Sequence, residues 1–225
     1  MYAIKWKKET PMLVIIGALF IASAFLYPHL PNKIPMHWNI RGQVDSYAAK
    51  STVTVLLFPF IALCLYAITL FFPFIDPRKN RYVQFEKAYY ISRFALIAFF
   101  AVVWTALMSA SIGLNVSIGK IIPGCVAVLL MVLGNYMGKV RRNWFFGIRL
   151  PWTLSSEENW NKTHRLGGKL FVISGVVGLL SCGLKPQWTF GILLGAIAIA
   201  VIATTVFSYR LFSRKNPVAK TSDEK

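Results

Sequence analysis

Six long runs of apolar residues, separated by short stretches that contain Lys and Arg, dominate this sequence. A helix needs about 20 mainly apolar residues to cross the ~30 Å hydrocarbon core of a bilayer. The first, fourth and fifth runs are short, so they need flanking residues or a locally thinner bilayer, and the fifth is the weakest. The pattern predicts an all-α integral membrane protein with about six transmembrane helices, at residues 12–27, 52–75, 89–114, 121–137, 170–184 and 188–211.

The charge of the chain favours a membrane protein over a nucleic-acid-binding one. There are 25 Lys and Arg against 8 Asp and Glu, which gives a formal net charge of +17. The basic residues lie between the apolar runs, so we expect them to contact the anionic lipids of the inner leaflet and not nucleic acid. Most of them fall in alternate connections, and the positive-inside rule then places both termini in the cytoplasm. Residues 213–225 are predicted to form a disordered polar tail.

No motif indicates a catalytic, cofactor or metal site. The cysteines Cys64, Cys125 and Cys182 all lie inside apolar runs, where a free cysteine acts as a small apolar residue. No nucleophile has a base at a motif spacing, and no glycine-rich phosphate loop is present. All eight acidic residues are placed outside the six runs. This placement argues against an ion-coupled carrier, but it leaves a passive carrier or channel open.

The connection between the first two runs carries the most distinctive external motif. Two prolines four residues apart prevent a continuous helix and favour extended backbone, so we expect an ordered cap over the outer helix ends. His37 and Asp45 are expected to form a polar pair, which is too few ligands for a zinc site. The residues predicted to face a ligand are Pro31, Pro35, His37, Trp38, Asn39, Gly42 and Asp45.

The connection between the fourth and fifth runs is dense in aromatic and basic residues. Ser155 and Glu158 fit a capping box and predict a short helix, which Gly167 and Gly168 would end. Aromatic residues among arginines suit a segment in the headgroup layer or, alternatively, a docking platform for a soluble protein. The candidate docking residues are Asn143, Phe146, Gly147, Arg149, Pro151, Trp152, Thr153, Trp160, His164 and Arg165.

Two spacings predict close packing of helices. Trp160 and His164 lie four residues apart and therefore share one face of the predicted short helix. Small residues also recur four apart within the runs, which lets helix backbones approach closely in lipid. These small-residue pairs are Gly134 with Gly138, Ser174 with Gly178, and Gly191 with Gly195.

The two connections together resemble the SdpI family of bacterial membrane proteins. The later one carries Phe146-Gly147-Ile148-Arg149-Leu150-Pro151-Trp152-Thr153-Leu154, followed by Trp160 and Thr163-His164-Arg165. The earlier one, with Leu30-Pro31, Ile34-Pro35, His37-Trp38-Asn39, Gly42 and Asp45, is similar to a domain often found N-terminal to it. The resemblance covers most of the chain. It divides the chain into residues 1–118, with three helices and the outer cap, and residues 119–212, with three helices and the basic aromatic loop.

The resemblance implies a multi-pass protein of the bacterial inner membrane that gives immunity to a secreted, membrane-active peptide toxin. It also implies signalling, in which the protein retains a cytoplasmic autorepressor at the membrane. The toxin would meet the outer cap and the repressor the cytoplasmic loops. Because a repressor's DNA-binding face and these loops are both basic, docking would use another surface of the repressor. The alternatives are a small carrier or channel-like protein, and a signalling adaptor without an immunity role.

Overall fold

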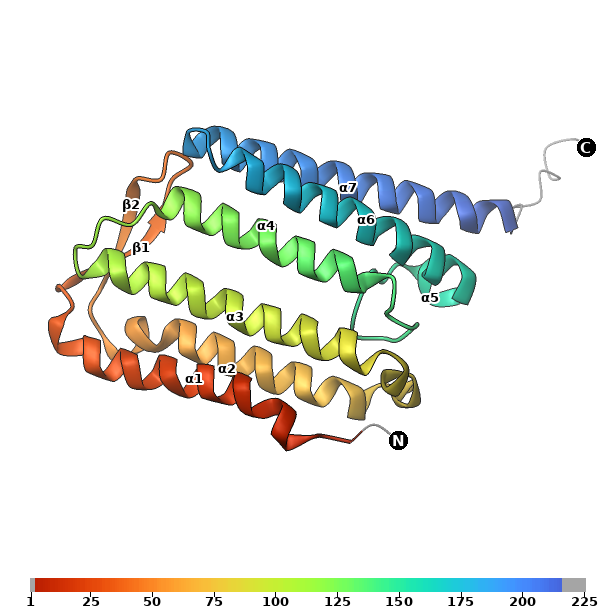
Figure 1. Ribbon diagram of the computed structural model, residues 1–225, viewed down its shortest axis with the longest axis horizontal. Helices are drawn as coiled ribbons and strands as arrows, with labels where there is room; N and C mark the ends of the chain where they lie inside the picture. Colours follow the sequence, from red (N-terminus) through yellow and green to blue (C-terminus); the bar gives the residue numbers. More distant parts are fainter. Residues whose placement is uncertain (1–2, 216–225) are drawn as a thin grey trace, which may run out of the picture.

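The computed structural model describes residues 3–215 as six long helices with a β-hairpin at one end (Figure 1). The long helices are α1 (Trp6–Leu26), α2 (Thr52–Ile75), α3 (Glu86–Ser111), α4 (Ile118–Met137), α6 (Glu157–Ser181) and α7 (Pro186–Lys215). They are connected by the 3-10 segments η1 (Tyr27–His29) and η2 (Lys79–Phe85), the short helix α5 (Pro151–Ser155), and the strands β1 (Lys33–Trp38) and β2 (Val44–Ala49).

The helices form two groups that meet between α3 and α4. Figure 1 shows α1, α2 and α3 side by side, and α4 next to α6 and α7. Both ends of the described chain lie at the same end of the bundle as η2 and α5, and the hairpin covers the opposite end. We call these the termini end and the hairpin end. A hydrophobic core fills the first group, where Met12, Val55 and Ile97 are almost completely buried.

The composition of the helices shows a multi-pass membrane protein. Five helical segments are long and apolar enough to cross a membrane, namely Trp6–His29, Thr52–Ile75, Lys79–Ser111, Ile118–Met137 and Pro186–Arg214. The predicted fifth span lies in α6, which has 25 residues and packs against α4 and α7 but has a polar first half. The count of six spans and the orientation of the termini therefore remain predictions.

Helix α6 corrects one prediction from the sequence. Gly167 and Gly168 do not end a short helix, because α6 continues through them to Ser181. They are needed for packing instead. A Cβ on Gly168 would lie 2.6 Å from the carbonyl oxygen of Gly134 on α4, and one on Gly167 would lie 2.6 Å from Ile148. The absence of side chains at Gly134 and Gly168 lets α4 and α6 approach closely. Of the predicted small-residue pairs, Gly134 and Gly178 lie against a neighbouring helix, whereas a Cβ on Gly191 or Gly195 would meet no atom within 4 Å.

The start of α6 and the end of α7 lie at slightly different residues from those predicted. Ser156, not Ser155, caps α6, because its Oγ accepts a hydrogen bond from the N–H of Asn159 at 3.3 Å. Helix α7 continues to Lys215, so the predicted polar tail does not begin at residue 213. The rest of that predicted tail, residues 216–225, lies outside the described residues.

Candidate functional site

The motif between the first two helices, with Pro31 and Pro35, folds into an antiparallel hairpin. Lys33 pairs with Ala49 and Trp38 with Val44, and the register is irregular between Pro35 and Trp38. Proline has no N–H to donate to a strand partner, so Pro35 suits an irregular position. The predicted extended cap is confirmed, and it is a β-hairpin in an otherwise helical fold.

A tight turn seats the hairpin tip on the helices. The side-chain oxygen of Asn39 accepts hydrogen bonds from two backbone N–H groups of the turn, at 2.9 and 3.2 Å. Gly42 has a φ of +76°, and a Cβ there would lie 3.3 Å from the Cα of Gly119 at the start of α4. A Cβ on Gly119 would lie 2.9 Å from Pro186 at the start of α7. The turn therefore needs glycine at both positions to join the hairpin to α4 and α7.

Beneath the hairpin lies a cavity of about 560 Å³ that the hairpin shares with α2, α3, α4 and α7. Most of its lining is apolar, and its polar side chains, His37, Asn39 and Asp45, all come from the hairpin segment. His37 Nδ1 and Asp45 Oδ1 lie 2.5 Å apart, so the predicted polar pair is confirmed. Apolar walls with a few polar groups at one side are typical of a ligand site. The cavity residues are Met36, His37, Trp38, Asn39, Ile40, Asp45, Phe58, Val103, Leu107, Ile118, Gly119, Ile122, Pro123, Pro186 and Phe190.

The structure separates the seven residues predicted to face a ligand. Four of them line the cavity, which are His37, Trp38, Asn39 and Asp45. Gly42 shapes the tip instead, and exposed Pro31 and buried Pro35 lie outside the lining. Between residues 3 and 215, no group of three His, Cys, Asp or Glu side chains could hold a metal ion.

At the termini end, Asn143 organises the loop between α4 and α5. Its side-chain oxygen accepts hydrogen bonds from the N–H groups of Phe145 (2.9 Å) and Phe146 (2.6 Å). Its side-chain nitrogen donates to the carbonyl oxygens of Arg141 and Phe146, at 2.8 and 2.9 Å. Asn143 is fully buried. The side chain thus replaces the backbone pairing that this irregular loop lacks.

His164 anchors the same loop to α6. Its Nε2 accepts a hydrogen bond from the N–H of Ile148 at 2.9 Å, so its Nδ1 carries the proton and donates to the carbonyl oxygen of Trp160 at 2.8 Å. The two rings are stacked with centroids 4.0 Å apart, which confirms the predicted shared face. Gly147 has a φ of +114° and lies against His164, leaving no space for a Cβ.

Asp76 connects the loop to the other helix group. One carboxylate oxygen accepts hydrogen bonds from the N–H of Trp144 at 2.9 Å and from the hydroxyl of Tyr82 at 3.0 Å. The other accepts from the N–H of Arg78 at 2.7 Å. Because Asp76 ends α2 and Trp144 follows α4, this buried carboxylate holds the two groups together at the termini end.

These contacts correct the docking prediction for four residues. Asn143, Thr153, Trp160 and His164 are fully buried, so they contact neither lipid headgroups nor a soluble partner. They are buried because their polar atoms satisfy backbone groups of the loop and of α6. Of the other predicted docking residues, two are partly buried (Phe146 and Trp152) and four are exposed (Gly147, Arg149, Pro151 and Arg165).

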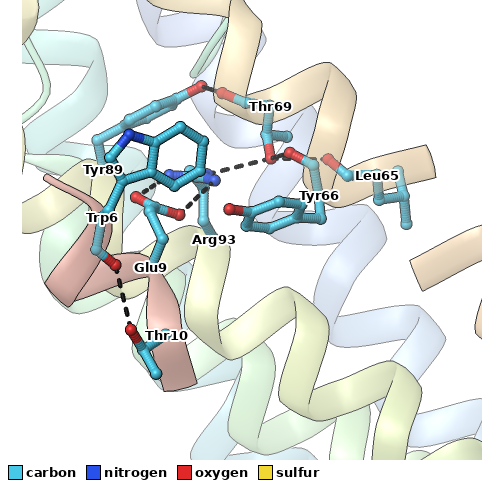
Figure 2. A network of polar contacts seen from close by, with 8 residues as sticks. All are labelled: Trp6, Glu9, Thr10, Leu65, Tyr66, Thr69, Tyr89 and Arg93. Carbon is cyan, nitrogen blue, oxygen red and sulfur yellow. Dashed lines mark hydrogen bonds and ion pairs between the residues drawn. The ribbon is translucent and has the colours of Figure 1, made fainter. Parts of the chain in front are cut away.

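A buried ion pair lies within the first helix group, near the termini end (Figure 2). The guanidinium of Arg93 on α3 donates two hydrogen bonds of 3.0 Å to the carboxylate of Glu9 on α1. Its Nε donates to Thr69 Oγ1 on α2 at 3.2 Å, and the guanidinium carbon lies 5.2 Å from the ring centre of Tyr66. The side chains of Glu9 and Arg93 are 4% and 2% exposed. The pair therefore ties three helices together with almost no access to solvent.

The ion pair corrects the prediction that no acidic residue falls inside a span. The expected first helix began at residue 12, whereas α1 begins at Trp6 and includes Glu9. The sequence did contain a signal, because Arg93 lies close to an apolar run. A cation in that position needs a counter-charge.

Comparison with known proteins gives the family. Residues 139–208 match the SdpI/YfhL protein family, and residues 14–63 match a domain of unknown function, DUF1648. The C-terminal part of the chain, residues 139–208, therefore resembles the SdpI family. The chain is 26% identical over 210 residues to the immunity protein SdpI of Bacillus subtilis (strain 168), which covers 93% of this chain and 98% of that protein. No solved structure matches it.

The two matches fall on the two regions described above. The SdpI-family match begins at residue 139, so it includes the anchored loop with Asn143 and His164, all of α5 and α6, and most of α7. The DUF1648 match includes the whole hairpin, with His37, Asp45 and Gly42, and parts of α1 and α2, the helices that flank it. The family resemblance seen in the sequence is confirmed, and the chain is a multi-pass protein of the bacterial membrane.

Proposed function

We propose that this protein is a membrane immunity protein that binds a secreted, membrane-active peptide at the hairpin end. The cavity of about 560 Å³ under the hairpin is the observation that carries the proposal. The charge pattern of the connections predicts that the hairpin faces the outside, where such a peptide arrives. The similarity to a protein named as an immunity protein supports the same reading.

Binding of the peptide would be non-covalent and would involve no catalytic reaction. The cavity walls are mainly apolar, so they suit bulky apolar side chains of the peptide, with about 25 cal/mol gained per Å² of apolar surface buried. His37, Asn39 and Asp45 would hydrogen-bond polar groups of the peptide at the hairpin side of the cavity. Because the hairpin segment carries Lys33, Arg41 and Lys50 against one acid, charge attraction would not capture a cationic peptide. A peptide held here could not assemble in the bilayer.

Survival and membrane potential of peptide-sensitive cells would test this proposal across a panel of secreted bacterial peptides. Cells that produce the protein should survive at least one peptide. Ile122→Trp, which places a large ring in the cavity lining, should remove that protection at an equal membrane level. Ile199→Trp is the matched control, because Ile199 on α7 is 68% exposed and lies outside the lining. Equal protection by both variants would contradict binding in the cavity.

A signalling role is the second candidate, and one surface favours it. Trp144 and Arg149 of the anchored loop and Pro151 at the start of α5 are exposed at the termini end, and Arg149 donates a hydrogen bond to the carbonyl oxygen of Trp144. A rigid apolar and cationic surface suits docking of a cytoplasmic autorepressor through a face that is not its basic DNA-binding one. Trp144→Ala should then change repressor retention at the membrane while protection is kept.

If the protein protects cells against none of the peptides, the next experiment is a measurement of ion flux in liposomes, which tests a carrier or channel.

A further inference from the structure

A basic groove lies between α4 and α6 at the termini end, with a volume of about 670 Å³. It forms where the two helices approach over glycine. Gly134 and Gly168 are in backbone contact, whereas Gly138, one turn further along α4, faces open space beyond the stem of Arg165. The groove residues are Gly134, Asn135, Gly138, Arg165, Gly168, Lys169, Val172 and Ile173.

Two cations of this groove have no acidic partner among the residues that the structure describes. Arg165 and Lys169 lie one turn apart on the exposed side of α6. Some other cations at this end are paired with a carboxylate, for example Lys162 with Glu158 at 2.7 Å. The exposed side chain of Asn135 adds a hydrogen-bond donor and acceptor on the α4 side. The groove therefore presents two positive charges from α6 and one side-chain amide from α4.

A separate apolar hollow lies further along α4, away from the termini end. It has a volume of about 790 Å³ and lies between α3, α4 and the far end of α6. Val128 and Val132 of α4 line it, and Asn135 of the basic groove follows three residues later on the same helix face. At 1.5 Å per residue, the α4 face from Ile121 to Asn135 extends about 21 Å, the length of a long acyl chain.

We propose that this surface is a binding site for an anionic phospholipid. Arg165, Lys169 and Asn135 would hold the phosphate diester, and an acyl chain would lie in the apolar hollow. The charged headgroup would thus contact the basic groove at the termini end of α4, and the acyl chain would contact the apolar residues further along the same helix. Basic pockets between helices near a membrane surface are suited to anionic headgroups. The site depends on membrane residence and does not depend on the proposed immunity function.

Lipid retention by the purified full-length protein would test the site by native mass spectrometry in detergent. The probes are phosphatidylglycerol and phosphatidylcholine, added separately to delipidated protein. The wild type should retain phosphatidylglycerol preferentially. Arg165→Gln with Lys169→Gln should reduce this retention about tenfold or more, since each cation contributes about a factor of five. Lys79→Gln with Lys87→Gln is the control with the same charge change, at exposed residues of the same end outside the groove, and should change retention less than twofold.

A second variant tests the shape of the site without a change of charge. Gly138→Leu should fill the groove, and the fold should tolerate it because a Cβ there meets only Arg165, with Cγ at an ordinary 3.6 Å. Phosphatidylglycerol retention should fall while thermal stability and protection against peptide stay unchanged. Unchanged retention in both the charge and the filling variants would overturn the proposal. Displacement of the lipid by inorganic phosphate alone, or a second copy of the chain in its place, would overturn it as well.

Discussion

The two ends of the bundle use motif residues in opposite ways. At the termini end, the polar atoms of Asn143 and His164 are buried and bonded to the protein's own backbone. At the hairpin end, His37 and Asp45 bond to each other, remain partly exposed and line a cavity. The comparison shows that a motif dense in aromatic and polar residues can stabilise the fold and not bind a partner. Of these four motif residues, only His37 and Asp45 are placed to meet a ligand.

The largest predicted effect tests whether the termini end is held together by buried polar contacts. Glu9→Ala leaves the charge of Arg93 buried without a partner, and we expect a loss of about 3–5 kcal/mol in the free energy of unfolding. Thermal unfolding in detergent would measure it. Glu86→Ala is the matched control, because its partners Lys5 and Lys8 are more than half exposed and the pairs should contribute less than about 1 kcal/mol.

A double variant separates the charge from the shape at that ion pair. Glu9→Leu combined with Arg93→Leu removes both charges, and it should recover much of the stability that Glu9→Ala loses. A stability of the Glu9→Ala variant equal to that of Glu86→Ala would show that the pair is not buried in the membrane protein. It would weaken the contrast between the two ends.

The next effect concerns the anchored loop. Asn143→Ala removes the acceptor for the N–H groups of Phe145 and Phe146, and we expect a loss of about 2–3 kcal/mol. Arg149→Ala removes one exposed hydrogen bond to the carbonyl oxygen of Trp144 and should cost less than about 1 kcal/mol. Unfolding in urea would compare them. An Asn143→Ala variant with full stability but altered partner binding would reverse the interpretation of this loop.

At the hairpin end, function should change more than stability. Gly42→Ala places a side chain at a positive φ, which costs about 1–2 kcal/mol locally, and forces the tip away from Gly119. The cavity loses part of its wall, so the peptide concentration that cells survive should fall about tenfold, or about 1.4 kcal/mol of binding. Gly113→Ala is a control at another positive φ, where no atom lies within 4 Å of the added Cβ. Equal loss of protection in both variants would indicate strain alone.

The smallest effect is expected for the polar pair. His37→Ala removes one hydrogen-bonding group from the cavity and should weaken protection several-fold, by about 1 kcal/mol of binding. Because the pair is exposed, the free energy of unfolding should change by less than about 1 kcal/mol. His29→Ala is the matched control, since His29 is exposed and lies outside the lining. A stability loss in His37→Ala without loss of protection would place the pair with the structural contacts.

The sequence predicted what depends on local pattern. Apolar run lengths located the long helices, and the spacing of Pro31 and Pro35 predicted an extended cap. The pairing of His37 with Asp45 was suggested separately by their residue types. The sequence did not predict a continuous α6, because Gly167 and Gly168 break helices in isolation but here fit against Ile148 and against Gly134 of α4, respectively. Packing partners of this kind are distant in the chain.

Burial was the part that the sequence could not predict. Asn143 and His164 are polar residues in a polar stretch, and only the folded loop shows that their atoms bond inward. Glu9 was placed outside the membrane because charged residues near a helix start are usually solvated, and its partner Arg93 lies 84 residues away. The cavity walls are ordinary apolar residues of four helices, and nothing in their spacing marks Leu107 or Phe190 as facing a shared space.

The most direct test of the central claim is photo-cross-linking from both ends of the protein. A photoreactive phenylalanine analogue would replace Trp38, which lines the cavity, or Trp144, which is exposed at the termini end. Cells that produce each of the two substituted proteins would be treated with the peptide against which the protein protects. Cross-links to the peptide from position 38 and none from position 144 are the predicted result. Cross-links from position 144 alone, or equally from both positions, would contradict binding at the hairpin end.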